Sequence, residues 1–586
     1  MTQKRLLVFF TFSLAAALPA AANPPPPVAF DWFEYTGRDP VFASPLPAGH
    51  YRNPILAGFY PDPSICRAGD DFYLINSTFA YFPGIPVFHS RDLVNWTQLG
   101  HVIDRPGQLN YDGLGVSRGI FAPALSQHAG TFYVVCTMAD AGGNFLVTAT
   151  NPAGPWSDPV WLGFDGIDPS LFFDDDGRAW LINNGAPEGP PLYEGHRAIW
   201  VQEFDPVAKK LLGPRSVLVN GGVDLAKKPV WIEGPHLYKR GGWYYLCCAE
   251  GGTGDNHSQV ILRSKSVTGP FVPWGRNPIL TQRDLDGTVP QAVTTTGHAD
   301  LVIGPDGNWW SVFLGCRPFA GRFYATGRET FLLPVKWTDD GWPLILPPGE
   351  RVPYVVPGPK VERADPSAFS SAAPKASGRT SPPDEPSTKT AAKGLAALPF
   401  TGNFTWRDDF SGARLSPLWV MLRSPPQPWW SLTTNPSQLR LTPRADQLSG
   451  KGSPAFLARR LQHSHFEAST ALVVPVVNGV SAGLVAFQNE NHHYYLGVHH
   501  TAEGLSVFVE RLNGSAPEIL ASAVVPPTRL IELRLTGEAQ VLTFAYATTP
   551  GKWQTLVPAA DATVLTTEAA GGFVGAMVGL HARLDR

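Results

Sequence analysis

A short pattern that returns five times along the chain constrains the fold more than any other feature of the sequence. Each copy reads as a strand, a tight turn with Gly or Asp, and a second strand rich in aromatic residues, which is a β-hairpin signal. The copies begin at Asp62, Ala122, Asp168, Gly234 and His298. Their return about every 45 to 65 residues predicts the five blades of a β-propeller.

Three copies carry a carboxylate at or beside the same position, namely Asp62, Asp168 and Glu233. Equivalent positions in a propeller converge on the central axis, so we expect these acids to share one pocket. A single Asp before Pro is explained by turn capping. Three at matching positions favour a functional role, because crowded like charges resist joint ionisation and therefore cost free energy.

The rest of the chain predicts a second all-β domain. A chain of 586 residues is too long for one ordinary domain. Residues 358–398 are rich in Ser, Ala, Pro and Lys and read as a linker. From residue 399 to residue 586, short alternating segments without a helical pattern indicate a β-sandwich. We therefore expect an all-β protein, with a propeller over residues 23–357 and a sandwich after the linker.

The N-terminus has the features of an export signal. Lys4 and Arg5 precede an apolar run from Leu6 to Leu18, and small residues follow up to Ala22. This predicts a signal peptide over residues 1–22 and a secreted or periplasmic protein; the alternative is a frayed or anchoring N-terminus. The run is too short to span a membrane.

Charge and composition narrow the class of ligand. A net charge of −3 gives no electrostatic reason to expect nucleic acid or an anionic membrane as a partner. The 18 Trp, 16 Tyr and 33 Phe residues suit a propeller core and also a neutral, hydroxyl-rich ligand such as an oligosaccharide or polysaccharide. The five cysteines show no zinc-site spacing, and most are expected to be small buried hydrophobes. Composition does not predict the oligomeric state.

Glycoside hydrolysis is the chemistry that best fits three converging acids. One carboxyl must donate a proton to the leaving oxygen, and another must act on water as a base or on the sugar as a nucleophile. A third carboxylate nearby raises the pKa of the acid, so that it stays protonated near neutral pH. Chemistry alone does not assign these roles among the three residues.

Several longer motifs resemble those of glycoside hydrolase family 43. Within that family they resemble the β-xylosidase/α-L-arabinofuranosidase branch, which carries a C-terminal concanavalin-like β-sandwich. The matching motifs lie at residues 53–56, 58–65, 76–87, 89–96, 166–170, 232–239, 296–301 and 327–331.

This resemblance implies an exo-acting hydrolase that inverts anomeric configuration and releases xylose and/or arabinofuranose from xylan-derived oligosaccharides. By motif, Asp62 would be the general base, Glu233 the general acid and Asp168 the residue that tunes the pKa of the acid. Inversion predicts that the Asp62 and Glu233 carboxyls lie roughly 6.5–9.5 Å apart, which leaves room for a water molecule. No cofactor is implied as a requirement.

The resemblance also implies four substrate-binding residues, each with a simpler explanation. Arg328 resembles a sugar-contacting arginine, or forms a surface salt bridge. Phe79 resembles a wall of the sugar subsite, or is ordinary packing. Phe121 stands where family members commonly have Trp, which leaves the substrate preference open. His298 resembles an axial histidine that in some members faces a bound Ca²⁺ through water, although imidazole is a poor direct ligand for that ion.

The sequence leaves other functions open. One is a non-catalytic sugar-binding propeller, and another is a hydrolase of the same family acting on arabinan or a different glycan. A third is a related five-bladed enzyme that acts on fructans and retains configuration. Trp429 and Trp430 either approach the pocket or pack within the second domain.

Overall fold

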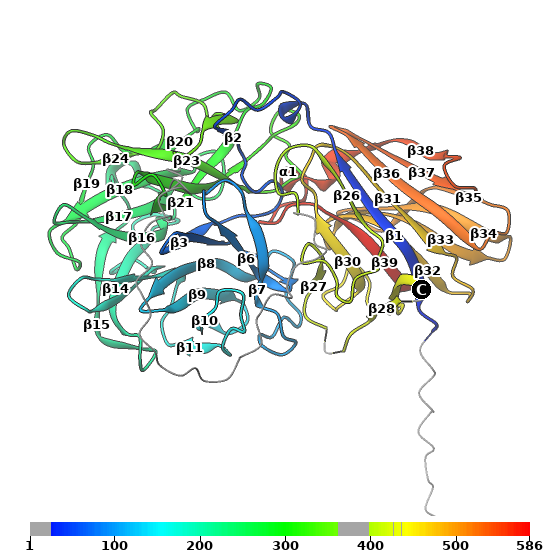
Figure 1. The fold of residues 1–586 in the computed structure, drawn as a ribbon, viewed down its shortest axis with the longest axis horizontal. Helices are drawn as coiled ribbons and strands as arrows, with labels where there is room; N and C mark the ends of the chain where they lie inside the picture. The colour runs from blue at the N-terminus through cyan, green and yellow to red at the C-terminus, as the bar shows by residue number, and fades with distance from the viewer. Residues whose placement is uncertain (1–24, 361–397, 426, 435, 586) are drawn as a thin grey trace, which may run out of the picture.

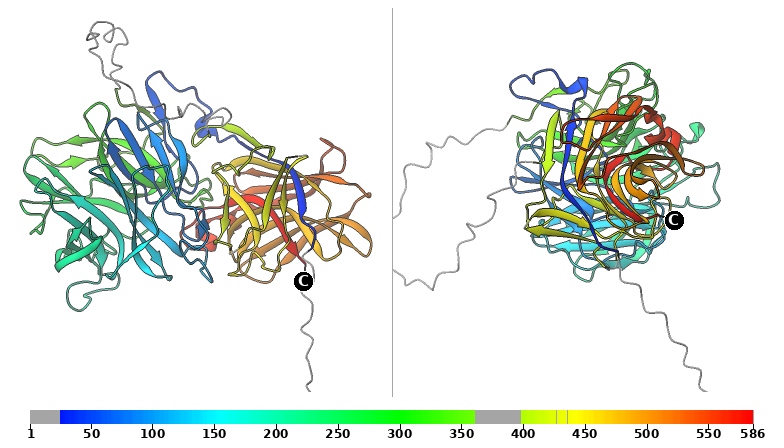
Figure 2. Two further views of the ribbon diagram at one scale, coloured as in Figure 1. Left: turned by 60° about the horizontal axis from the view of Figure 1, so that its bottom comes forward. Right: turned by 90° about the vertical axis from the view of Figure 1, so that its right-hand side faces the viewer.

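The computed structural model describes residues 25–360, 398–425, 427–434 and 436–585. The predicted signal peptide (residues 1–22) and almost all of the predicted linker lie outside these ranges. The described chain is nearly all β-structure and forms two bodies side by side, a propeller and a sandwich (Figures 1 and 2). Within those ranges, no helix has the length and apolar character needed to cross a bilayer.

The propeller has five antiparallel blades, as the five copies of the pattern predict. In every blade the strand that contains residues of the repeated pattern is innermost. Blade 1 contains β3 (Ser64–Ala68), β4 (Asp71–Ile75), β6 (Gly84–Ser90) and β7 (Thr97–Ile103). Blade 2 contains β8 (Gly119–His128), β9 (Thr131–Ala139), β10 (Gly143–Ala149) and β11 (Val160–Leu162). Blade 3 contains β12 (Ile167–Phe173), β13 (Ala179–Gly185), β14 (Ala198–Asp205) and β15 (Lys210–Asn220).

The last two blades follow the same plan. Blade 4 contains β16 (Glu233–Arg240), β17 (Trp243–Glu250), β18 (Ser258–Ser264) and β19 (Val272–Pro273), with β20 (Leu280–Thr281) also paired to β18. Blade 5 contains β21 (Thr294–Ile303), β22 (Trp309–Cys316), β23 (Glu329–Trp337) and β24 (Pro343–Leu344). Outside the blades, β2 (His50–Arg52) pairs with β25 (Val355–Pro357).

One backbone feature recurs at the axis in all five blades. The first residue of each copy adopts a left-handed conformation, with φ of 50° at Asp62, 33° at Ala122, 54° at Asp168, 55° at Gly234 and 51° at His298. In blades 2 to 5 a shift in strand register spans this residue. Such a bulge re-aims a side chain out of the regular alternation. The repeat therefore presents one residue per blade to the axis, where these residues line a small cavity.

The second body is a sandwich of two antiparallel sheets. One sheet has the order β28 (Trp430–Thr434), β29 (Ser437–Leu441), β1 (Val28–Gly37), β31 (His465–Val473), β36 (Leu530–Glu538), β37 (Val541–Ala547) and β38 (Gln554–Asp561), with β26 (Phe404–Asp408) paired to β1. The other has the order β35 (Glu518–Val524), β34 (Gly504–Asn513), β33 (His492–Thr501), β32 (Val480–Asn489), β39 (Met577–Leu584), β30 (Ala455–Arg460), β27 (Val420–Leu422) and β5 (Tyr81–Phe82).

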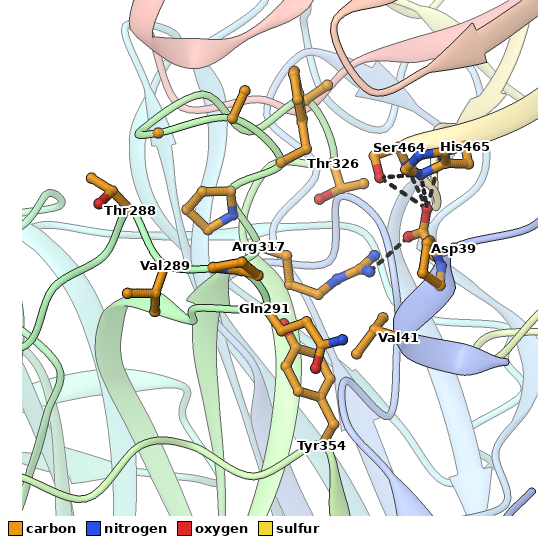
Figure 3. Close-up of a pocket in the computed structure, with 17 residues that line it drawn as sticks. Asp39, Val41, Thr288, Val289, Gln291, Arg317, Thr326, Tyr354, Ser464 and His465 are labelled. Atoms are coloured by element: carbon orange, nitrogen blue, oxygen red, sulfur yellow. Dashed lines mark hydrogen bonds and ion pairs between the residues drawn. The ribbon is translucent and has the colours of Figure 1, made fainter. Parts of the chain in front are cut away.

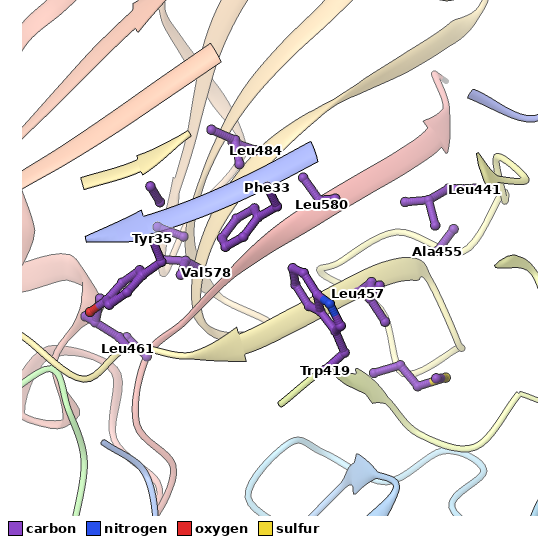
Figure 4. Packing of buried hydrophobic residues seen from close by; sticks show 14 of the residues in the cluster. Phe33, Tyr35, Trp419, Leu441, Ala455, Leu457, Leu461, Leu484, Val578 and Leu580 are labelled. Carbon is purple, nitrogen blue, oxygen red and sulfur yellow. The ribbon is translucent and has the colours of Figure 1, made fainter. Parts of the chain in front are cut away.

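The predicted start of the propeller at residue 23 is wrong, because β1 belongs to the sandwich. This strand pairs with β31 from Phe30 to Gly37, and Phe33 and Tyr35 lie among the buried side chains between the two sheets (Figure 4). Buried and less buried side chains alternate along most of this strand in the structure, but such alternation does not tell which sheet a strand joins. The first blade strand of the propeller is β3.

The five cysteines are free thiols, and four of them are buried. This confirms the prediction that most behave as small hydrophobes. No disulfide therefore joins the two bodies, which are held together by packing, hydrogen bonds and ion pairs.

A buried ion-pair cluster lies at the seam between the two bodies, beside a cavity of about 360 Å³ (Figure 3). Arg317 of the propeller donates to Asp39 at 2.8 Å and to both carboxylate oxygens of Glu329 at 2.5 and 2.9 Å. Asp39 also accepts from the backbone N–H groups of Ser464 and His465 in the sandwich. Because each charge has partners, the cluster serves as a clamp between the bodies.

Replacing Arg317 by Met should destabilise the protein strongly, because Asp39 and Glu329 would remain buried without their partner. Breaking a buried pair in this way typically costs about 3–5 kcal/mol. Urea unfolding followed by tryptophan fluorescence measures the change. The control is Arg322→Met, which removes an exposed pair with Asp255 and should cost less than about 1 kcal/mol. Equal stability losses in the two variants would contradict the assignment of a clamp.

Candidate active site

A cavity of about 440 Å³ opens over the propeller axis and receives side chains from all five blades and from the sandwich. The three predicted acids line it, and so do the four predicted substrate-binding residues, Phe79, Phe121, His298 and Arg328. The structure therefore brings together every site residue that the sequence predicted.

Asp62 is held as a carboxylate by three neighbours. Arg328 Nη1 donates to its Oδ1 at 2.6 Å, and Ser77 Oγ donates to its Oδ2 at 2.6 Å. His298 Nδ1 lies 3.9 Å from Oδ1. Burial opposes ionisation, but the charge of Arg328 and these neighbours together hold the pKa of Asp62 below its ordinary value.

Glu233 has the opposite environment. It begins β16, its side chain is buried, and no group of the described residues donates a hydrogen bond to its carboxyl. Burial raises its pKa well above the ordinary value, and the nearby charges of Asp168 and Asp62 raise it further. Of the three acids, Glu233 therefore has the environment that most favours the protonated form.

Asp168 lies between these two extremes. It is buried, and its Oδ2 accepts from the backbone N–H of Gly234 at 3.1 Å, beside Glu233. Burial raises the pKa of Asp168 as well, while His298 acts against that rise. Because Asp168 accepts a backbone hydrogen bond and Glu233 accepts none from the described residues, the charged form is favoured more at Asp168 than at Glu233.

The fourth copy of the pattern places its acid one residue early for a steric reason. Gly234 occupies the axial position there, and a Cβ at this residue would lie only 2.9 Å from Nε2 of His298. The histidine ring fills the space that a fourth axial side chain would need. The carboxyl therefore comes from Glu233, just outside the bulge.

Aromatic rings from both bodies form one wall of the cavity. The Phe79 ring centroid lies 5.1 Å from that of Phe121 and 6.1 Å from that of Phe573 in the sandwich. The backbone N–H of Phe573 donates to Ser117 Oγ at 3.0 Å. Arg328 is buried beneath this wall, paired with Asp62, so it does not form the surface salt bridge that was the alternative.

Sequence reasoning missed Phe573. Its only local signal is the preceding pair Gly571 and Gly572, which marks a turn and not a site. Neither Trp429 nor Trp430 lines the cavity, and Trp429 is buried in the sandwich core. Packing within the second domain is therefore the correct alternative for Trp429.

Three further lining residues were also missed, Arg118, Arg197 and Trp231. Arg118 makes two hydrogen bonds to Asp140, at 2.6 and 2.7 Å, and lies over the Phe121 ring. Arg197 lies over Trp231 on the opposite side of the cavity, beside Glu233. Exposed arginines are common, so the sequence gives no reason to select these two.

In the described part of the chain, no group of three or more His, Cys, Asp or Glu side chains is arranged to hold a metal ion. A calcium ion near His298 therefore stays a prediction, and the acid–base chemistry expected of the three carboxyls uses none.

Two buried carboxyls with opposite pKa shifts that face one cavity fit acid–base hydrolysis of a glycosidic bond. The family model for glycosyl hydrolases family 43 matches residues 51–343, and the model for the beta xylosidase C-terminal concanavalin A-like domain matches residues 407–584. The chain belongs to glycosyl hydrolase family 43.

Relatives match over most of their length. A xylosidase/arabinosidase of Butyrivibrio fibrisolvens is 38% identical, over 90% of this chain and 95% of that one. A non-reducing end alpha-L-arabinofuranosidase of Bacteroides ovatus is 36% identical, over 91% of each chain. The crystal structure of a GH43_12 protein from a capybara gut metagenome superposes with a TM-score of 0.84 and 38% identity, over 95% of this chain and 99% of that one.

Replacing Phe573 by Ala should lower kcat/KM about tenfold or more, because it removes one ring of the wall without touching a carboxyl. Initial rates on nitrophenyl xyloside and nitrophenyl arabinofuranoside measure the effect. The control variant, Phe573→Leu, keeps an apolar side chain of similar size and should lower kcat/KM less. Full activity of the alanine variant would show that the sandwich does not contribute to the site.

Proposed function

We propose that the protein is an exo-acting, inverting glycoside hydrolase that releases xylose and/or arabinofuranose from xylan-derived oligosaccharides. The observation that carries this proposal is the unequal environment of two acids in one pocket. Asp62 is paired with Arg328, whereas Glu233 is buried without a hydrogen-bond donor among the described residues. The activities for which the relatives are named, which include those of xylosidases and arabinofuranosidases, support the substrate class.

In the proposed reaction Glu233 donates its proton to the glycosidic oxygen as the bond to the anomeric carbon breaks. Asp62 accepts a proton from the water that attacks that carbon from the opposite face. Asp168 keeps a negative charge near Glu233, which favours the protonated acid before each turnover. One displacement gives the free sugar with inverted configuration, and exchange with solvent restores the two protonation states.

The shape of the cavity supports exo action. Phe573 reaches from the sandwich to the aromatic wall, where it contacts blade 2 through Ser117. Arg328 Nη2 donates to the Phe573 carbonyl at 3.4 Å and so joins the same loop to blade 5. With this side walled off, a terminal sugar can enter while the rest of the oligosaccharide lies toward the opposite side.

Glu233→Gln should lower kcat on xylobiose or arabinoxylan oligosaccharides by about 100- to 10,000-fold, because the amide cannot protonate the leaving oxygen. The fall in kcat on a glycosyl fluoride should be much smaller, since fluoride leaves without needing a proton. The control is Glu518→Gln on the exposed strand β35 of the sandwich, which should leave both rates unchanged. Retention of near-normal turnover on the oligosaccharides by the Glu233 variant would overturn the role of the acid. Saturable binding without product by the unaltered protein would favour the sugar-binding propeller instead.

The pH dependence of kcat/KM should be bell-shaped. Activity needs Asp62 ionised, and its lowered pKa places the acidic limb below the ordinary range of a carboxyl. Activity also needs Glu233 protonated, and its raised pKa places the loss of rate on the alkaline side, as pH rises through that value. Glu233→Gln, assayed on a glycosyl fluoride, should lose the alkaline limb and keep the acidic one. An unchanged alkaline limb in that variant would contradict the assignment.

Proton NMR of the first-formed sugar should show inverted configuration, for example α-xylose from a β-xyloside. This outcome follows from a single displacement in which water, and not a carboxylate, attacks the sugar. A first-formed anomer with retained configuration would point to a covalent intermediate, and therefore to the retaining enzyme considered as an alternative.

A further inference from the structure

The residues around the cavity divide into two sides. The aromatic wall comes from blades 1 and 2 and the sandwich. On the other side Arg197, which lies just before β14 in blade 3, meets Trp231, which lies just before β16 in blade 4. Glu233 is only two residues beyond Trp231, so this pair lies on the side of the cavity that carries the protonated acid.

The arginine of this pair is held rigidly. Its Nε and Nη2 both donate to Asn184 Oδ1, at 2.9 and 2.6 Å, and its guanidinium carbon lies 4.8 Å from the centre of the Trp231 ring. Asn184 is fully buried, and its Nδ2 donates to the carbonyl of Ile232 at 2.5 Å. Asn184 therefore fixes Arg197 relative to the segment that carries Glu233, and Nη1 of Arg197 makes no hydrogen bond with the described residues.

The tryptophan of the pair is held in an unusual way. Its φ is 52°, a conformation that bulky L-residues rarely adopt. The backbone is anchored by Trp231 N–H to the Gly195 carbonyl at 2.9 Å and by Gly251 N–H to the Val230 carbonyl at 2.8 Å. The side chain nevertheless stays 38% exposed, while its neighbour Ile232 is fully buried. Ile232 therefore supplies the core packing, and the part of the indole that Arg197 does not cover is accessible to a ligand.

The proposed reaction requires a second sugar on this side. A general acid must reach the glycosidic oxygen, so the leaving sugar lies next to Glu233, opposite the water that Asp62 activates. A half-exposed indole packs against the C–H face of a sugar ring, and a fixed guanidinium matches neighbouring hydroxyls. A neutral pyranose therefore fits both members of the pair.

We propose that Arg197 and Trp231 form the subsite for the leaving-group sugar and determine how well the enzyme accepts a pyranose there. Asn184 is the positioning residue that keeps Arg197 in place. This inference rests on the proposed function, because Glu233 must be the proton donor for the leaving group to occupy that side.

The test compares two substrates that share the transferred sugar and differ in the leaving group. One pair is xylobiose and β-D-xylopyranosyl fluoride, and the other is arabinofuranosyl-xylobiose and α-L-arabinofuranosyl fluoride. For the pair that the unaltered enzyme cleaves, Trp231→Ala should lower kcat/KM on the disaccharide or trisaccharide about tenfold or more. The value of kcat/KM on the fluoride, which has no sugar as its leaving group, should change by about twofold or less. Comparing the two changes in kcat/KM therefore isolates the contacts to the leaving-group sugar.

Two further variants separate ligand contact from folding. Trp231→Phe keeps a stacking face, so its kcat/KM on the oligosaccharide should be close to that of the unaltered enzyme. Arg197→Met should lower kcat/KM on the oligosaccharide selectively. Trp161→Ala, which removes an exposed ring on the outer strand β11, is the matched control and should leave both substrates unchanged.

Three outcomes would overturn the proposal. An equal fall in kcat/KM on both substrates would show that Trp231 contacts the transferred sugar or is needed for folding. No fall in kcat/KM on either substrate would show that Trp231 is not part of the site. If the unaltered enzyme cleaves neither pair of substrates, the proposed function itself fails, and the leaving-group subsite fails with it.

Discussion

The ion pair between Arg328 and Asp62 is the contact on which the chemistry of this propeller depends. Three buried carboxyls share one cavity, and they cannot all ionise without mutual repulsion. Arg328 and Ser77 stabilise the charge on Asp62. Glu233 has no such donor among the described residues, so burial and, after it, the nearby charges of Asp168 and Asp62 raise its pKa. In the proposed reaction this ion pair helps to distinguish the base, Asp62, from the acid, Glu233, within one pocket.

The scaffold makes this arrangement possible through regularity and one departure from it. Each blade offers a left-handed residue to the axis, and Asp62, Asp168 and His298 occupy that position in three of them. In blade 4 the His298 ring leaves no room for a side chain, so Gly234 takes the position and the acid moves to Glu233. The sandwich completes the pocket with Phe573 and is fixed to the propeller by the buried Arg317 cluster.

Much of this could be predicted from the sequence, since the signals are local and repeated. The five copies of the pattern predict the five blades, and the matching positions of Asp62 and Asp168 predict their convergence. The partner sheet of β1 could not be predicted, because its alternation fits either body. Nor could the placement of Phe573, Arg197 and Trp231, because each reaches the cavity through loop geometry and contacts distant in sequence. Asn184, for example, accepts from Arg197 and donates to the carbonyl of Ile232, which lies 48 residues further along the chain than Asn184.

The proposed mechanism requires the proton to lie on Glu233 and not on Asp62 at neutral pH. Neutron diffraction from a crystal exchanged into heavy water, without substrate, tests this directly. The mechanism predicts a deuteron on the Glu233 carboxyl, none on Asp62, and deuterons from Arg328 and Ser77 pointing at the Asp62 oxygens. A deuteron on Asp62, or a bare Glu233 carboxylate, would contradict it.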